Sequence, residues 1–367
     1  MDGGAATNRF TKLSQHGGRL SAAQAAYPNA PTPWIDLSTG INPRAYPAPR
    51  SSSLERARLP DPAKLAELES IAAAAFGVRD GQRIIATAGS ELALRLLPVV
   101  LGVSGATVVG PTYSSHPDAW RKADRNVSER MLHDVDDAVR GGGALIVVNP
   151  NNPDGAVLDR ERLLALHDAL AQNGGVLIVD EAFIEVAPDH SVSDVAGSDR
   201  TPSLVTIRSF GKFYGLAGLR LGFAIGAPRI IERLRHLLGD WPISSEALGA
   251  GLAAYGHREW AESTRERLQR SARRLDGLLV RAGCELVGGT SLFRLVRHAH
   301  AAQLFEHLLR MGILTRPFDH DPTLLRFGLP HGSAAWSRLG KAVKRWEDAP
   351  SLTLPRSAGE GIGERHE

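Results

Sequence analysis

The segment SLVTIRSFGKFYGLAGLRLGF, residues 203–223, joins an apolar run to a loop of small residues that carries one lysine, Lys212. Val, Ile and Thr favour a strand over the first part. Glycines in the second part allow another group to approach the backbone closely. Lysine forms imines with carbonyl groups, and Arg220 would help to keep its amine unprotonated. We interpret Lys212 as the residue that reacts with an aldehyde, although a lysine in such a loop, taken alone, is usually solvated.

Similar apolar runs precede this segment along the chain. VLIVDEAF (176–183), ALIVVNPNNPDG (144–155), ATVVGPTY (106–113) and RIIATAG (83–89) all read as strands. Helical patterns separate them: AKLAELESIAAAAFG (63–77), ELALRLLPVVLG (91–102) and RERLLALHDALAQNG (160–174). Strands alternating with helices predict an α/β fold with a mostly parallel sheet covered on both faces. Ligands of such sheets bind at the carboxyl ends of the strands, where Asn149, Asp180 and Ser209 fall.

The chain divides into five predicted parts. Residues 1–15 and 348–367 lack periodicity and are predicted to be disordered tails. The Pro-rich stretch 16–62 reads as an extended arm that contributes to a smaller domain and to the site. Residues 63–250 form the predicted large domain. The predicted small α/β domain, 251–347, contains the strand-like runs CELVGGTSLFRLVR and TLLRFGLP.

Composition excludes several classes of protein. The 367 residues are 43% hydrophobic, which supports a packed core, and the single Cys284 excludes an intrachain disulfide framework and a cysteine zinc cluster. We expect a reducing, cytoplasmic setting. No stretch resembles a signal peptide or a membrane span. With 43 Lys and Arg against 40 Asp and Glu, the net charge of +3 is too small to indicate nucleic acid, whereas small anionic substrates remain plausible.

Histidine does not indicate a metal centre. His116, His298 and His300 lack an accompanying carboxylate or thiol pattern. We therefore predict no metal and place all three histidines on the surface.

Two polar residues at strand ends suit a pyridine ring. Asp180 ends the run GGVLIVDEAF, where a carboxylate can meet a buried ring nitrogen and keep it protonated. Asn152 in NPNNPDG offers an amide to the phenolic oxygen of such a ring. A helix cap or an exposed acid is the alternative for Asp180, and a simple turn is the alternative for Asn152.

A phosphate site is predicted where AGSELAL (88–94) joins a strand to a helix. Gly89 and Ser90 would present backbone N–H groups and a hydroxyl at the helix start. Ser209 and Arg220 would complete a charge-assisted cradle. Tyr113 in PTYSSH could stack on the ring. Ser90 as a plain N-cap and Tyr113 as a buried structural residue are the alternatives. Imine, ring and phosphate sites together fit pyridoxal 5'-phosphate (PLP).

The ordered motifs AGSE, PTY, NPNNPDG, DEAF and SFGK...GLRLGF resemble those of the fold-type I PLP enzymes related to histidinol-phosphate aminotransferase, over residues 16–345. The resemblance implies a Schiff base on Lys212 and a homodimer with sites near its interface. It also implies that Phe183 and Leu59 stand where that family usually has tyrosines that contact the cofactor. The implied cofactor-binding residues are Gly89, Ser90, Glu91, Tyr113, Asn152, Asp180, Ser209, Lys212 and Arg220.

A narrower resemblance concerns the arm. HGGRL (16–20) with DLSTGINP (36–43), together with GGTSLFRLV and LLRFGLP, is similar to the threonine-phosphate decarboxylases of cobalamin biosynthesis. This implies that O-phospho-L-threonine loses CO2 to give (R)-1-amino-2-propanol O-2-phosphate. The alternatives are a histidinol-phosphate or other amino-acid aminotransferase and, third, a silent PLP-binding regulator.

The substrate site is predicted from residues that bind anions. Arg326 in LLRFG offers two parallel donors to a carboxylate or phosphate, and a surface ion pair is its alternative. The other candidate substrate-binding residues are His16, Gly40, Asn42, Asn152 and Arg294.

Overall fold

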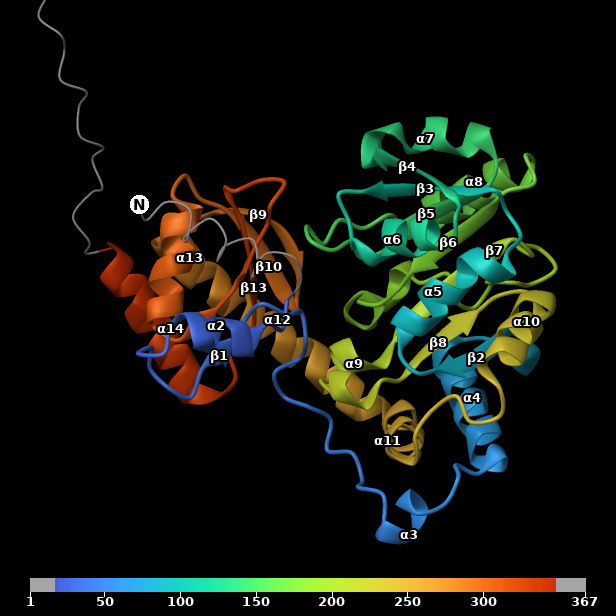
Figure 1. Ribbon diagram of the computed structural model, residues 1–367, viewed down its shortest axis with the longest axis horizontal. Helices are drawn as coiled ribbons and strands as arrows, with labels where there is room; N and C mark the ends of the chain where they lie inside the picture. Colours follow the sequence, from blue (N-terminus) through green and yellow to red (C-terminus); the bar gives the residue numbers. More distant parts are fainter. Residues whose placement is uncertain (1–16, 348–367) are drawn as a thin grey trace, which may run out of the picture.

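The computed structural model describes residues 17–347. The two predicted tails and His16 lie outside the described residues. Two bodies, each built on its own sheet, are joined by a long helix and by the N-terminal arm (Figure 1). Within residues 17–347, no helix combines the length and the apolar character that a membrane span requires.

The larger body contains a seven-stranded sheet in the order β2-β8-β7-β6-β5-β3-β4. Only β8 runs against its neighbours β2 and β7; the other pairs are parallel. The prediction of a mostly parallel sheet is therefore confirmed. The strands are β2 (Ile84–Thr87), β3 (Gly105–Gly110), β4 (Asn126–Met131), β5 (Ala144–Val148), β6 (Val176–Asp180), β7 (Leu204–Ser209) and β8 (Gly222–Ile225).

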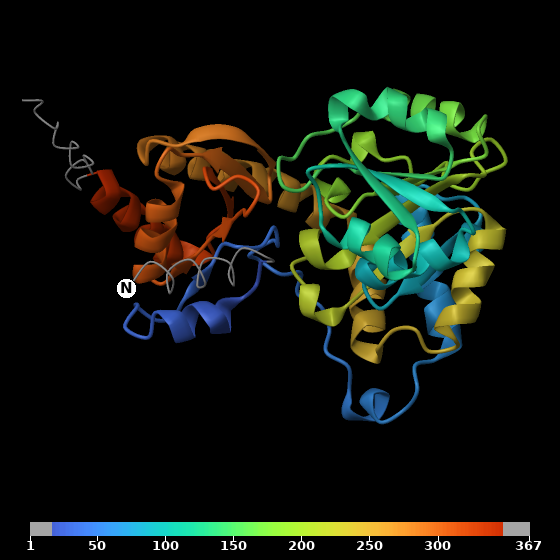
Figure 2. The same ribbon diagram turned by 45° about the horizontal axis from the view of Figure 1, so that its top comes forward.

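Both faces of this sheet are covered because its central strands are apolar throughout. Successive residues of a strand point to opposite faces of the sheet. Ile146 packs in the hydrophobic cluster on one face, and the next residue, Val147, packs in the cluster on the other. Figure 2 shows the covered sheet from a second side. One face carries α5 (Ser90–Val100), α6 (Ser115–Lys122) and α10 (Pro228–Leu238); the other carries α4 (Pro62–Phe76), α8 (Arg160–Ala171) and α11 (Ser245–Tyr255).

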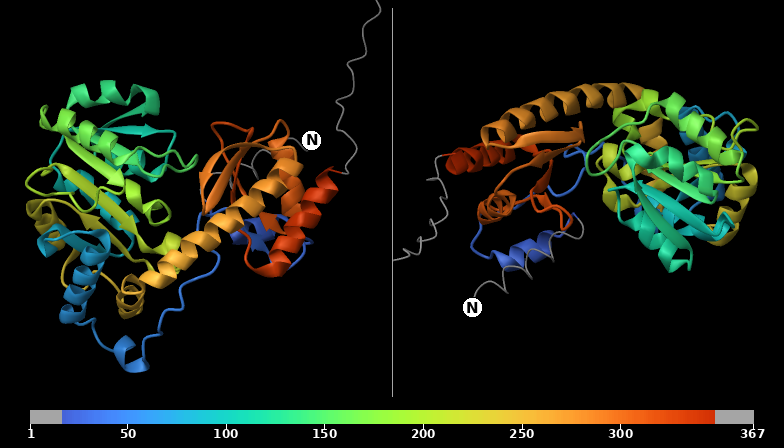
Figure 3. Two further views of the ribbon diagram at one scale, coloured as in Figure 1. Left: turned by 180° about the vertical axis from the view of Figure 1, so that it is seen from behind. Right: turned by 90° about the horizontal axis from the view of Figure 1, so that it is seen from above.

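The smaller body is an antiparallel sheet in the order β12-β13-β10-β9. Helix α12 (Arg258–Arg281) runs along it and connects it to the larger body (Figure 3). The remaining elements here are β9 (Glu285–Thr290), β10 (Phe293–Arg297), α13 (Ala301–Arg310), β11 (Ile313–Leu314), β12 (Arg316–Pro317), β13 (Leu324–Gly328) and α14 (Gly332–Glu347).

The N-terminal arm joins the two bodies. It contains α2 (Leu20–Ala26) and β1 (Ile35–Asp36), and β1 pairs in parallel with β11. The arm then returns to the larger body, where the Tyr46 backbone N–H donates to Tyr214 O at 2.8 Å. The arm is thus less extended than expected, because LSAAQAA has the small residues of a helix. The division into five parts stays a prediction.

Residues 17–347 also contain several short elements. They are α3 (Ser53–Arg56), α7 (Val135–Ala138) and α9 (Phe210–Phe213), with 3-10 turns at Gly81–Arg83, Leu132–Asp134, Val139–Gly141, Ile184–Val186, Pro188–His190 and Ala217–Leu219.

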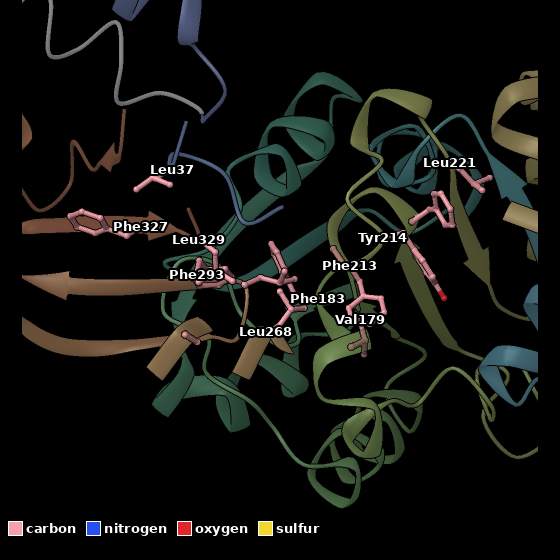
Figure 4. Packing of buried hydrophobic residues seen from close by; sticks show 14 of the residues in the cluster. Leu37, Val179, Phe183, Phe213, Tyr214, Leu221, Leu268, Phe293, Phe327 and Leu329 are labelled. Carbon is pink, nitrogen blue, oxygen red and sulfur yellow. The ribbon is translucent and has the colours of Figure 1, made fainter. Parts of the chain in front are cut away.

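One hydrophobic cluster extends through both bodies. Phe183 of the larger body packs edge-to-face against Phe293 of β10, with ring centroids 5.1 Å apart. Figure 4 shows this pair between Phe327 in the smaller body and Val179 in the larger one. This contact packs the larger body against β10 of the smaller body.

Candidate active site

A cavity opens at the carboxyl ends of the central strands, between the two bodies. Most of the predicted site residues line it: Gly40, Ser90, Glu91, Tyr113, Asn152, Asp180, Ser209, Lys212, Arg220 and Arg326. Phe183 and Arg316 also line it, and neither had been named as a binding residue. Gly89 adjoins the cavity through Arg220.

Lys212 lies on α9, one turn of helix that begins directly after β7. The arm fixes this turn, because the Asn42 backbone N–H donates to Lys212 O at 2.9 Å. Desolvation of the amine, followed by the positive charge of Arg326, lowers the pKa of Lys212 to about 8. The predicted effect of Arg220 is present but smaller. The amine is therefore far more nucleophilic at neutral pH than that of an exposed lysine.

Asp180 ends β6 with both carboxylate oxygens in contact with donors. Oδ1 accepts from the Ala182 backbone N–H at 3.0 Å, and Oδ2 lies 2.9 Å from Nε2 of His116. Both His116 and Asp180 are buried. The surface position predicted for His116 is wrong: the histidine sits on α6, on the face that turns toward the sheet. His298 is half-buried and His300 is exposed.

The start of α5 forms an anion-binding corner. Gly89 has φ of +86°, which favours glycine, and a methyl group added there would lie 2.6 Å from Nη2 of Arg220. The guanidinium thus packs directly on the helix start, beside Ser90 and Ser209. Free backbone N–H groups, the helix dipole and Arg220 together favour a phosphate.

The carboxylate of Glu91, beside this corner, is bound by two other side chains. This carboxylate accepts hydrogen bonds from Nε of Arg95 at 2.8 Å and from the hydroxyl of Tyr113 at 3.1 Å. Glu91 therefore holds the Tyr113 ring in the cavity wall, where it can cover a flat ligand.

Two arginines from the smaller body lie at the other end of the cavity. Arg316 on β12 is directly opposite Arg326 on β13, and neither forms an ion pair with any of the residues 17–347. Arg326 donates to Asn152 Oδ1 and, at 2.9 Å, to Ser38 O. Within residues 17–347, the Nε atoms of both arginines have no hydrogen-bond partner. Burial and Arg316 lower the pKa of Arg326. This end of the cavity favours an anion strongly.

Sequence reasoning missed Arg316 because its strand has only two residues. The signal was present as ILTRP, an apolar run with one arginine, shortly before LLRFG.

Two predicted substrate residues do not line the cavity. Leu295 lies opposite Arg326 in the pairing of β10 with β13, so the neighbouring Arg294 points to the other face of the sheet. There its Nε pairs with Asp276 Oδ1 of α12 at 2.6 Å. The amide of Asn42 donates to Phe213 O at 2.8 Å and so fastens the arm to α9. The positions of Arg294 and Asn42 give no support to a role in substrate binding.

The described residues offer no candidate metal site. The described part of the chain holds no group of three or more His, Cys, Asp or Glu side chains placed to bind one ion.

The family model "Aminotransferase class I and II" matches residues 32–338. The chain belongs to the class I and II aminotransferase family. Within this aminotransferase family, the chain is 39% identical over 331 residues to the threonine-phosphate decarboxylase of Pseudomonas aeruginosa, covering 90% of this chain and 97% of that one. It is 30% identical over 302 residues to histidinol-phosphate aminotransferase 1 of Bradyrhizobium diazoefficiens, covering 77% and 84%.

The fold is that of solved aminotransferases. Histidinol-phosphate aminotransferase from Sinorhizobium meliloti, in complex with pyridoxal-5'-phosphate, superimposes with a TM-score of 0.75 at 18% identity, covering 89% of this chain and 94% of that one. The α/β fold predicted from the alternating strands and helices, and the PLP-enzyme fold implied by the motifs, are confirmed.

Proposed function

We propose that this chain is a PLP-dependent decarboxylase of O-phospho-L-threonine. The observation that carries the proposal is the similarity, over nearly the full length of both chains, to a threonine-phosphate decarboxylase. The cavity supports it independently, because it has one anion site beside Ser90 and a second, separate one at Arg316 and Arg326.

The residues of the cavity fit PLP. Lys212 provides an amine of lowered pKa for its aldehyde, and Asp180 provides a buried carboxylate for its ring nitrogen. Ser90, Ser209 and Arg220 would hold its phosphate, and Tyr113 would cover its ring. Bound PLP supplies an electron sink for the electron pair that remains on Cα when CO2 leaves.

The chain's own residues orient the substrate. Arg316 and Arg326 would bind its phosphate, since two adjacent guanidinium groups match a dianion. The carboxylate then has no matching cation among the described cavity residues, because Arg220 is used by the cofactor. The substrate carboxylate would therefore not be held by an arginine when CO2 leaves. After the Cα–carboxylate bond breaks, the ammonium of Lys212 can return a proton to Cα.

We also propose a homodimer and a cytoplasmic location. Leu54, Leu59 and Trp241 expose 56%, 67% and 51% of their surfaces, and the last two line one groove, which supports an interface there. Leu59 is at the position where the family's tyrosine reaches the partner. The lone, buried Cys284 supports a reducing compartment. In this proposal the product, an aminopropanol phosphate, serves cobalamin biosynthesis.

Transamination is the second candidate, favoured by the family and by the aminotransferase relative. Product analysis separates the two. We expect the purified protein with PLP and O-phospho-L-threonine to release CO2 and 1-amino-2-propanol O-2-phosphate without any 2-oxo acid. Lys212→Arg should abolish this, whereas Lys64→Arg, at the protein surface, should not. Turnover that requires 2-oxoglutarate would contradict decarboxylation.

A further inference from the structure

Among the described residues at the substrate end of the cavity, Phe183 is the one large apolar side chain. Three other apolar residues of the cavity lie next to residues assigned above to the cofactor. Leu94 is on α5 with Ser90, Val148 ends β5 shortly before Asn152, and Leu221 follows Arg220. The described cavity residues that remain, besides Lys212 and Asn152, are Gly17, Thr39, Gly40, Ala182, Phe183, Gly211, Ala217, Arg316 and Arg326. Only Phe183 in this set offers an extended apolar surface.

The ring of Phe183 is held in a fixed position. Nζ of Lys212 lies 5.8 Å from its centroid, so the ring borders the space next to the reactive amine. Phe293 packs edge-to-face behind it, and the guanidinium of Arg326 lies 5.1 Å from the Phe293 centroid. The ring thus lines the cavity next to the amine, and Phe293 connects it to Arg326. We place the middle of a bound substrate beside this ring.

Gly40, in the N-terminal arm, packs closely against the same ring. A methyl group added at Gly40 would lie 3.0 Å from Cε1 of Phe183 and 2.9 Å from Cδ1 of Phe293. Any side chain at position 40 would therefore push both rings. Glycine at this position lets the arm close over the aromatic pair without moving it.

The geometry points to Phe183 as the residue that recognises the β-methyl group of the substrate; this inference rests on the proposed function. With the amine at Lys212 and the phosphate at the arginine pair, the β-methyl is the only apolar part of phosphothreonine. Contact with an aromatic face removes that methyl from water, whereas the polar groups lose hydration there. Phosphoserine lacks the methyl and gains nothing from the contact. Phe183 therefore sets the preference for threonine phosphate over serine phosphate.

The test compares kcat/KM for O-phospho-L-threonine and O-phospho-L-serine. We expect the unmodified enzyme to prefer phosphothreonine by about tenfold, the usual discrimination for one methyl group in an apolar pocket. Phe183→Ala should reduce this ratio to about 2 or less, mainly because kcat/KM for O-phospho-L-threonine falls. Phe183→Leu keeps an apolar contact and should give an intermediate ratio. Gly40→Ala, which displaces the ring without altering it, should also lower the ratio.

The control is Phe305→Leu, a buried phenylalanine of α13 that does not line the cavity. It should leave the ratio unchanged, and the absorbance of bound cofactor reports folding of every variant. Equal use of both substrates by the unmodified enzyme, or an equal loss on both in Phe183→Ala and Phe183→Leu, would overturn the inference. Decarboxylation of neither substrate would instead overturn the proposed function, and this inference with it.

Discussion

Nε2 of His116 lies 2.9 Å from Oδ2 of Asp180, and both side chains are buried. The histidine holds one oxygen of the carboxylate, and the Ala182 N–H holds the other. The geometry thus fixes the carboxylate that is expected to meet the cofactor's ring nitrogen. His116 acts by positioning Asp180.

Replacing His116 by Phe should weaken PLP binding by about tenfold or more, as expected for one buried hydrogen bond to a charged group. Titration of the cofactor absorbance measures this, and His300→Phe, at an exposed position, is the control. The Asp180→Asn variant should lose far more in kcat than in cofactor affinity. Unaltered PLP affinity and kcat in His116→Phe would show that Asp180 needs no such support.

The lowered pKa of Lys212 predicts how cofactor attachment depends on pH. Only the neutral amine reacts, so the second-order rate of PLP attachment to the cofactor-free protein should rise about tenfold per pH unit and level off near pH 8. An ordinary lysine would continue to rise to above pH 10. Stopped-flow absorbance gives the profile, and a rate still climbing between pH 9 and 10 would be inconsistent with the buried amine.

Arg316 and Arg326 should act on the substrate rather than on the cofactor. Arg316→Ala is expected to raise KM for O-phospho-L-threonine by about tenfold or more, with the bound-cofactor spectrum unchanged, since it removes one charge-assisted contact. Arg326→Ala should do the same. Arg297→Ala, at an exposed ion pair with Asp321, is the matched control. An unchanged KM in both site variants would place the substrate anion elsewhere.

Arg208 predicts a stability effect behind the site. This buried arginine pairs with Glu181 at 3.2 Å and Glu185 at 2.9 Å. Arg208→Ala leaves two buried carboxylates without a cation and should cost about 3–5 kcal/mol in the free energy of unfolding. Arg162→Ala, which breaks an exposed pair with Asp136, should cost less than about 1 kcal/mol.

The loss in Arg208→Ala should grow with pH. Burial raises the pKa of Glu181 and Arg208 opposes this, so its removal raises that pKa further. A carboxyl with a raised pKa in the folded state stabilises the fold below its unfolded pKa and loses that contribution as the pH rises. Denaturant unfolding at pH 5 and pH 8 measures the difference. A smaller loss at pH 8 than at pH 5 would contradict this account.

The larger sheet and the cofactor end of the site were predictable because local signals carry them. Apolar strand runs ending in Asp180 and Ser209 place these side chains at one edge of the sheet, and a glycine before a helix marks the corner at Ser90. The sequence also indicated Arg326, because it lies within a strand-like run.

What the sequence did not show depends on contacts between distant segments. The burial of His116 follows from the packing of α6 on the sheet, and the direction of Arg294 from the register of β10. Arg316 reaches the cavity because β12 pairs with β13. Strand pairing and helix rotation of this kind leave no local pattern, since they depend on tertiary packing.

The most direct test of the central claim follows the hydrogen on Cα. O-phospho-L-threonine carrying deuterium at Cα is incubated with the PLP-loaded protein, and the product is examined by mass spectrometry and NMR. Decarboxylation breaks the carbon–carbon bond, so the aminopropanol phosphate should retain the deuterium on the carbon next to nitrogen and gain one hydrogen from water. Loss of the deuterium, with transfer of the amino group to a 2-oxo acid, would show that the chain is an aminotransferase.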